Sequence, residues 1–104
     1  MRLHNHPTTD TLTLTQVLYA LSDPARLSIV ENLATNGSQP CGAMCLPVAK
    51  STASHHFRVL REAGVILMTA EGTQFINSLR REDLDSRFPG LLDAVLQAAA
   101  VKGP

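Results

Sequence analysis

The segment KSTASHHFRVLREAG, from Lys50 to Gly64, has the spacing of an amphipathic helix and constrains the fold more than any other part of the chain. At about 100° of rotation per residue, its apolar residues Ala53, Phe57 and Leu60 fall on one side. Gly64 is suited to end such a helix because glycine readily adopts the backbone conformation that closes a helix terminus. One face of this helix therefore belongs to a core, and the other is free for contacts.

The other face of this helix carries side chains that donate hydrogen bonds. Ser51 or Thr52 can also cap the helix at its start. Such donors suit phosphate oxygens and base edges in the major groove of DNA, which admits one helix. Glu62 opposes this locally, and His56 falls beside the apolar stripe. The candidate DNA-contacting residues of this helix, about 51–63, are Ser51, Thr52, Ser54, His55, Arg58 and, flanking them, Arg61.

The rest of the chain alternates helical and strand patterns. Asp23-Pro24 marks a helix start and Asn36-Gly37 its end. Leu27 and Ala34 belong to the expected apolar face of that helix. Besides the helix at 50–63, the expected elements are helices at 11–21 and 24–34, a short helix near 42–46, a hairpin at about 65–79 and a last helix at about 89–101.

This order predicts a mainly α fold with a small β-hairpin, namely a winged helix-turn-helix framed by two terminal helices. We expect residues 1–10 to be a flexible N-terminal arm and residues 11–104 to be one DNA-binding and dimerisation domain. Nine basic and nine acidic residues give a net charge of 0, so DNA binding would depend on local clustering of charge. Because no secretory or membrane-spanning run is present, we expect a cytoplasmic protein with no membrane partner.

The hairpin tip is Glu71, Gly72 and Thr73, without lysine or arginine, which predicts at most a weak contact with DNA. Arg80 and Arg81 at its base have two interpretations. They could bind phosphate, or they could form an ion-pair cluster with the adjacent residues 82–83.

The stretches LSDPARLSIVENLA and KSTASHHFRVLREAGVI resemble the ArsR/SmtB family of small bacterial winged-helix repressors, and the resemblance covers roughly residues 14–96. It implies a homodimer joined by its first and last helices, which binds a palindromic operator and releases it on an inducer. It also matches Ser51, Thr52, Ser54, His55 and Arg58 to the recognition-helix contacts of the family, and His56 to a structural position.

A homodimer also follows from the apolar residues of the terminal helices, which exceed what one thin core can cover. It would place two recognition helices about one DNA turn apart. The residues concerned are Leu12, Leu14, Leu18, Leu92, Val95 and Leu96.

Cys41 and Cys45 allow three interpretations. They could be buried apolar residues. They could form a thiol switch, since residues four apart on a helix lie about 6 Å apart, within the Cα separation that a disulfide tolerates. They could also bind nickel or zinc together with His4 and His6, as a tetrahedral S2N2 set. We rank the thiol switch above the metal.

The metal sites of the resembled family are Asp and His ligands on the last helix, or a C-x-C motif before the recognition helix. Here the last helix offers Asp93 without histidine, and Cys41 and Cys45 are spaced C-x-x-x-C. Both departures make a metal site of the family type doubtful.

Two functions of other classes compete with a DNA-binding regulator. An enzyme using Cys41 with a histidine lacks an orienting acid and a phosphate-binding loop, so we expect no enzyme. A winged-helix protein-interaction module with weak DNA binding is favoured by the net charge of 0 and by a hairpin tip without lysine or arginine.

Overall fold

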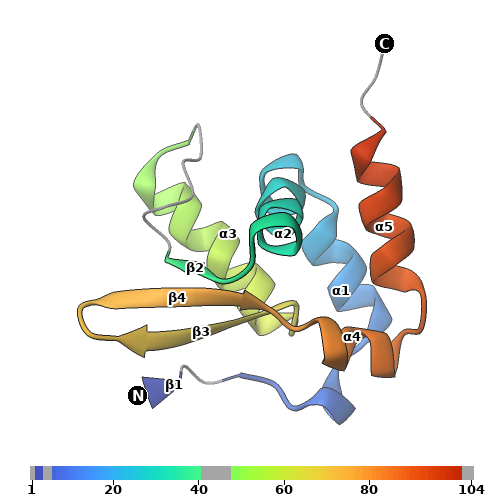
Figure 1. The fold of residues 1–104 in the computed structure, drawn as a ribbon, viewed down its shortest axis with the longest axis horizontal. Helices are drawn as coiled ribbons and strands as arrows, with labels where there is room; N and C mark the ends of the chain where they lie inside the picture. Colours follow the sequence, from blue (N-terminus) through green and yellow to red (C-terminus); the bar gives the residue numbers. More distant parts are fainter. Residues whose placement is uncertain (1, 4–5, 41–47, 102–104) are drawn as a thin grey trace.

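The computed structural model describes residues 2–3, 6–40 and 48–101. Five α-helices and a four-stranded antiparallel sheet make up this part of the chain, which confirms the predicted winged helix-turn-helix (Figure 1). In chain order the elements are β1 (Arg2–Leu3), the 3-10 helix η1 (Thr9–Thr11), α1 (Leu14–Leu21), α2 (Pro24–Asn36), β2 (Gln39–Pro40), α3 (Lys50–Glu62), β3 (Ile66–Glu71), β4 (Gln74–Leu79), α4 (Arg81–Arg87) and α5 (Leu91–Ala100).

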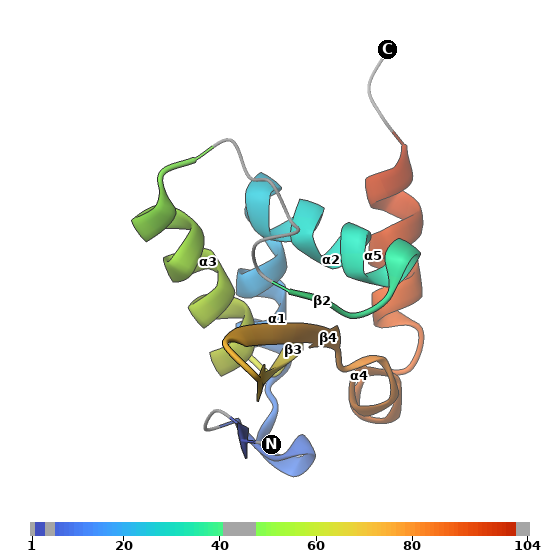
Figure 2. The same cartoon turned by 60° about the vertical axis from the view of Figure 1, so that its left-hand side comes forward.

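The core lies where α1, α2 and α3 meet the base of the sheet. These three helices lie on one side of the hairpin, with α3 on the far side of the α1–α2 pair from α5 (Figures 1 and 2). The apolar sides of all three helices are turned inward, so the fold is held chiefly by removal of these side chains from water. The core members from these helices and from the start of the sheet include Val17, Ala20, Leu21, Ile29, Val30, Leu33, Phe57, Leu60, Val65 and Ile66.

Helix α2 begins as the sequence predicts. The carboxylate of Asp23 accepts hydrogen bonds from the backbone N–H groups of Ala25 and Arg26, at 2.9 and 3.1 Å. These are two of the donors that a helix start leaves unpaired. The predicted apolar face was partly wrong, because Leu27 is only half-buried and Ala34 is exposed.

Helix α3 differs from its prediction at its start. Ala49 occupies the cap position and makes no side-chain cap, whereas Ser51 and Thr52 lie within the first turn. The prediction that one of these hydroxyls caps the helix was therefore wrong, and both remain exposed on its surface.

The end of α3 follows the prediction, at Gly64. The N–H of Val65 donates to the carbonyl of Leu60 at 2.9 Å, and the N–H of Gly64 donates to that of Arg61 at 3.1 Å. This pair of bonds is the Schellman closure, which needs a positive φ, and Gly64 has a φ of +85°. Leu12 lies against Gly64 where a Cβ would stand, so this glycine is also needed for packing.

The hairpin of β3 and β4 is confirmed, with a two-residue turn at Gly72 and Thr73. Two further strands were not predicted. β1 pairs with β3 and β2 pairs with β4, so the strand order is β1-β3-β4-β2. Residues near the amino terminus and residues before the cysteine segment thus lie along opposite edges of the same hairpin.

The segment before α1 makes several contacts. Nε2 of His6 accepts a hydrogen bond from the N–H of Met68 at 2.9 Å, and the carbonyl of Pro7 accepts one from Arg80 at 2.8 Å. The hydroxyl of Thr9 donates to Asp83 at 2.9 Å. The flexibility of residues 1–10 stays a prediction, and these contacts show where the described part of the arm is attached.

Two expectations at the carboxyl-terminal end need correction. The charged segment after the hairpin is helix α4 and not a break, because Leu84 is buried and anchors it. The last helix begins at Leu91, since Gly90 precedes it in a left-handed conformation. The short helix expected near 42–46 lies outside the described residues.

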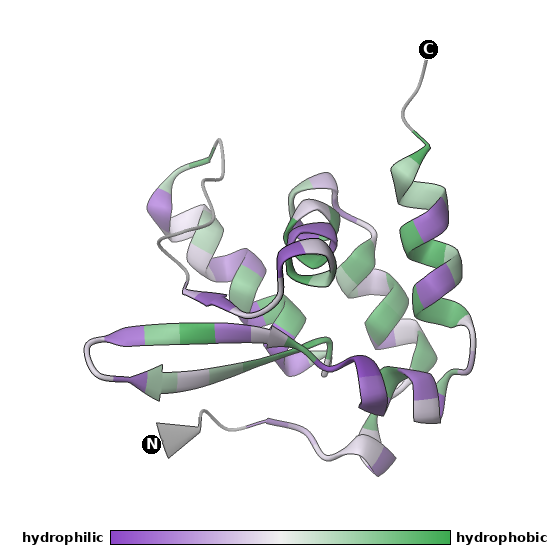
Figure 3. Cartoon of the chain, in the orientation of Figure 1, coloured by the Kyte–Doolittle hydropathy of each residue, from purple (hydrophilic) through white to green (hydrophobic). Residues whose placement is uncertain are grey.

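The apolar surplus predicted for the terminal helices is partly confirmed. Leu12 precedes α1 and is buried, and Leu92 is buried as well, so both are covered within one chain. Leu14 and Leu18 remain 46% and 43% exposed on α1. Hydrophobic residues run along both α1 and α5 (Figure 3).

Candidate nucleic-acid interface

Helix α3 presents one face to the core and the other to solvent. Phe57 and Leu60 are buried, and Ala53 on the same side is half-buried. Five of the six candidate DNA-contacting residues are exposed on the outer face. These five residues, hereafter the outer stripe, are Ser51, Thr52, Ser54, His55 and Arg58.

Two members of the outer stripe lie beside one another. Nη2 of Arg58 is 3.4 Å from Nδ1 of His55, one turn earlier on the helix. No carboxylate of the described residues forms an ion pair with Arg58. Its charge is therefore available to an external anion, and a guanidinium suits phosphate or guanine because it offers planar, bidentate donors.

Arg61, the sixth candidate, lies differently. It is half-buried, and its Nη1 is 3.6 Å from the sulfur of Met68 on β3. The structure thus places this side chain between α3 and the sheet rather than with the outer stripe. Glu62 is exposed at the carboxyl-terminal end of the helix.

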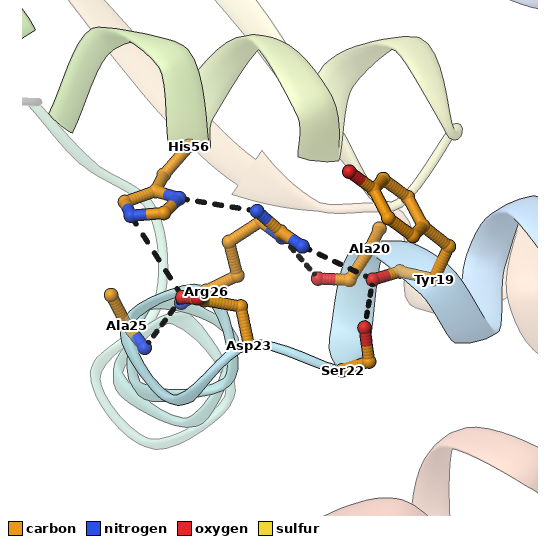
Figure 4. A network of polar contacts seen from close by, with 7 residues as sticks. All are labelled: Tyr19, Ala20, Ser22, Asp23, Ala25, Arg26 and His56. Atoms are coloured by element: carbon orange, nitrogen blue, oxygen red, sulfur yellow. Dashed lines mark hydrogen bonds and ion pairs between the residues drawn. The ribbon is translucent and has the colours of Figure 1, made fainter. Parts of the chain in front are cut away.

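A buried polar network fixes the inner side of α3 (Figure 4). The guanidinium of Arg26 donates to Nδ1 of His56 at 3.2 Å, and to the carbonyls of Ala20 and Tyr19 at 2.7 and 3.2 Å. It also lies 5.1 Å from the centre of the Tyr19 ring, a cation–π distance. Arg26 and His56 are both less than one-tenth exposed. Three helices therefore meet at one buried guanidinium.

Asp23 completes this network. Its carboxylate is 3.8 Å from Nε2 of His56. The hydrogen bond from the backbone N–H of Arg26, with smaller contributions from the N–H of Ala25 and from the charge of Arg26, holds the pKa of Asp23 below its ordinary value. The carboxylate therefore stays ionised at the start of α2, where the helix dipole favours negative charge.

The base of the hairpin carries internal ion pairs. Arg80 is buried, and its Nε donates to Asp83 at 2.9 Å. Arg81 donates to Asp93 on α5 at 2.8 Å, and this hydrogen bond raises the pKa of Arg81 above its ordinary value. Of the two interpretations of these arginines, the structure supports the ion-pair cluster, in which Arg81 pairs with Asp93 on α5 and also lies 3.8 Å from Asp85, one turn later on α4.

The family was determined by comparison with known proteins. A family model described as a helix-turn-helix domain matches residues 21–69. The HTH-type transcriptional regulator YceK of Bacillus subtilis is 36% identical over 84 residues, covering 77% of this chain and 83% of YceK. The chain belongs to the HTH-type transcriptional regulators.

A second relative of the regulator is the HTH-type transcriptional regulator MJ1325 of Methanocaldococcus jannaschii. It is 38% identical over 61 residues, covering 56% of this chain and 67% of that protein. The crystal structure of the ArsR family transcriptional regulator RHA00566 superposes with a TM-score of 0.65 at 19% identity, covering 86% of this chain and 98% of that one. This likeness shows the fold. Both sequence relatives are named as regulators and not as enzymes, which confirms that the regulator is no enzyme.

Of the four candidate sensing or metal-binding residues, only His6 lies among the described residues. Cys41, Cys45 and His4 lie outside the described residues. His6 has its Nε2 engaged with β3, whereas Pro40, which precedes Cys41, pairs with the opposite edge of the hairpin through β2. β3 and β4 lie between these two edges. The described residues contain no group of three or more metal-ligating side chains.

Sequence reasoning placed His56 on the core side but missed its partner. Arg26 lies three, four and seven residues before Ile29, Val30 and Leu33, which are all buried. These are the spacings of one helix face. The signal that could have identified Arg26 was thus a charged residue at a core position.

None of the helices within 2–3, 6–40 and 48–101 is long and apolar enough to cross a membrane.

Proposed function

We propose that this regulator is a homodimeric repressor that binds a palindromic operator through the outer stripe of α3 and is released by oxidation of Cys41 and Cys45. The observation that carries the DNA-binding part is the outer stripe itself, with Arg58 and His55 exposed side by side and, among the described residues, no carboxylate paired with Arg58. Donors of this kind suit a polyanion with readable base edges.

The proposed dimer joins α1 and α5 of two chains. Leu14 and Leu18 are exposed on α1, and Val95 and Leu96 on α5 are only half-buried against the core. A single chain leaves these apolar groups in contact with water, and two-fold pairing would cover them. Because α5 lies on the far side of the α1–α2 pair from α3, this pairing would leave both recognition helices free (Figures 1 and 2).

The proposed signal acts at the segment between β2 and α3. Pro40 pairs with Ile76 of β4, and Ala49 directly precedes α3. Formation of a disulfide would transfer two electrons and release two protons to an oxidant, and it would shorten the path between these two fixed points. The recognition helix would then shift relative to the hairpin. The alternative of the same fold is a nickel or zinc sensor at these cysteines.

The DNA-binding proposal is tested by the binding of the regulator to duplexes over a range of salt concentrations. We expect a sequence-selective affinity that falls steeply with salt, because phosphate contacts release counterions. Arg58→Ala should weaken binding to all duplexes and flatten the salt slope, whereas His55→Ala should change the preference among sequences. Arg81→Ala removes the same charge outside α3 and serves as the control. If Arg58→Ala and His55→Ala both bind as the wild type does, the outer stripe is not the contact surface.

A protein-interaction module is the second candidate function, favoured by the net charge of 0 and by a hairpin tip without lysine or arginine. Salt-insensitive or undetectable duplex binding by the wild type would support it.

The signal is tested separately. Operator binding is measured before and after a mild oxidant, with Cys41→Ser as the control, and nickel and zinc are titrated into the reduced protein. Loss of binding on oxidation in the wild type alone supports the thiol switch. Stoichiometric metal uptake that requires both cysteines supports the metal sensor instead.

A further inference from the structure

The guanidinium of Arg26 is the point at which the helix proposed for dimerisation and the helix proposed for DNA recognition are joined by hydrogen bonds. It donates to the carbonyls of Ala20 and Tyr19, in the last turn of α1, and to Nδ1 of His56 on α3. Arg26 itself stands in the first turn of α2. A displacement of α3 relative to α1 must therefore stretch or break a buried hydrogen bond.

The chemistry of this link fixes the tautomer of His56. Because a guanidinium can only donate, Nδ1 of the neutral ring must accept, and the ring proton is then on Nε2, facing the carboxylate of Asp23. Both Arg26 and His56 are buried, so loss of the acceptor would leave a buried donor without a partner.

His56 also fixes the rotation of α3 about its own axis. It is adjacent in sequence to His55 and two residues before Arg58, and both of these belong to the outer stripe. In a rigid helix the direction of one side chain determines the directions of its neighbours, at about 100° per residue. A ring held on the inner side by Arg26 therefore sets where the outer donors point.

We propose that Arg26 and His56 are positioning residues that set the orientation of the recognition helix relative to the dimer-forming helix, and hence the match of two recognition helices to a full palindromic site. This inference rests on the proposed function. It predicts a difference between the affinities for a full palindromic site and for a half-site. A weakened link should harm binding to a complete palindrome, which requires both helices in register, more than binding to a single half-site.

The test uses three substitutions of His56 that separate its two nitrogens. His56→Asn keeps an acceptor near the position of Nδ1. His56→Gln places a donor near the position of Nε2 and removes that acceptor, and His56→Leu removes both. Arg26→Lys keeps the charge but cannot reach three acceptors at once. Each variant is measured on a full-site and a half-site duplex, and urea unfolding gives the folded fraction that corrects each affinity.

We expect His56→Leu, His56→Gln and Arg26→Lys to bind the full site about tenfold more weakly than the wild type, with a change of less than about threefold on the half-site. His56→Asn should bind both sites as the wild type does. A structural role alone would lower both affinities in proportion to the loss of folded protein, and this result would overturn the proposal.

The tautomer gives a measurement that does not require DNA. Nitrogen NMR of the free protein should show His56 protonated on Nε2 with an unprotonated Nδ1, and a ring protonated only on Nδ1 would refute the link. A wild type that binds no duplex refutes the proposed function and the positioning role with it. Wild-type binding with no change in the variants refutes the positioning role alone.

Discussion

The substitution Gly64→Ala should be far more destabilising than the same change at other glycines with positive φ. Two separate costs meet at this position. Its φ of +85° is one that a residue with a Cβ adopts only with strain, at about 1–2 kcal/mol. The new methyl group would also collide with the side chain of Leu12, which is 1% exposed and enclosed by the core.

The second cost is that of overpacking, about 1–3 kcal/mol. The two together give about 2–5 kcal/mol, a large part of the roughly 5–15 kcal/mol that is ordinary for a small domain. Gly90→Ala is the matched control, because Gly90 has a φ of +81° and its new methyl group would have no neighbouring atom within 4 Å. It should cost only the backbone strain of about 1–2 kcal/mol.

The assay is urea unfolding at one fixed protein concentration, since dimerisation would make the midpoint depend on concentration. The midpoint of Gly64→Ala should fall well below that of Gly90→Ala, with an unchanged slope. In a double-mutant cycle, Leu12→Ala should remove the collision, so the pair should cost less than the sum of its members. Equal midpoints for the two glycine variants, together with additivity in the cycle, would refute the steric reasoning.

Three further outcomes are expected. Leu18→Glu should convert the dimer to a monomer, because it places a charge on the exposed apolar face of α1. Gln16→Glu, on another face of the same helix, should leave the dimer intact. Sedimentation equilibrium measures the mass of both variants. Asp83→Asn should reduce the free energy of unfolding near neutral pH, because the hydrogen bond from Arg80 holds the pKa of Asp83 below its ordinary value of 3.8. This contribution to the free energy of unfolding is present above pH 3.8 and is lost as the pH falls through the lower pKa that Asp83 has in the folded protein. The free energies of unfolding of the wild type and the variant should therefore converge in acid. A difference between them that stays constant down to about pH 2 would contradict the role given to the bond between Arg80 and Asp83. Arg80→Met should be destabilising at neutral pH, because the carbonyl of Pro7 and Asp83 both lose their buried donor, and a thermal melt equal to that of the wild type would show that these bonds contribute nothing.

The elements that could be predicted were those with a local physical signature. Asp23 and Pro24 predict the start of α2, because the cap made by Asp23 and the fixed φ of Pro24 act within a few residues. The apolar spacing of α3 and the glycine after it are equally local. The hairpin followed from two strand-like runs around Gly72.

The parts that could not be predicted depend on contacts between distant segments. Helix α4 has Leu84 as its one buried hydrophobic residue and so lacks an apolar period, and it is held by the packing of that side chain. β1 and β2 are two residues each, too short for any alternation, and they exist because β3 and β4 offer edges to pair with.

The candidate site divides in the same way. The exposed side of α3 could be predicted because amphipathic spacing determines which residues face water. The partner of His56 could not, because Arg26 lies 30 residues away in sequence and the contact arises from the packing of α2 against α3.

The strand order β1-β3-β4-β2 has a consequence for the behaviour of the protein at high concentration. Each outer strand is only two residues long, so the sheet presents very little continuous backbone to which a strand of another molecule could add. A projecting hairpin with long bare edges would invite ordered self-association into fibrils. Here the outer edge of β3 is paired at Thr69 and Ala70 and that of β4 at Ile76 and Asn77, so a short outer strand interrupts each edge along which such growth would start.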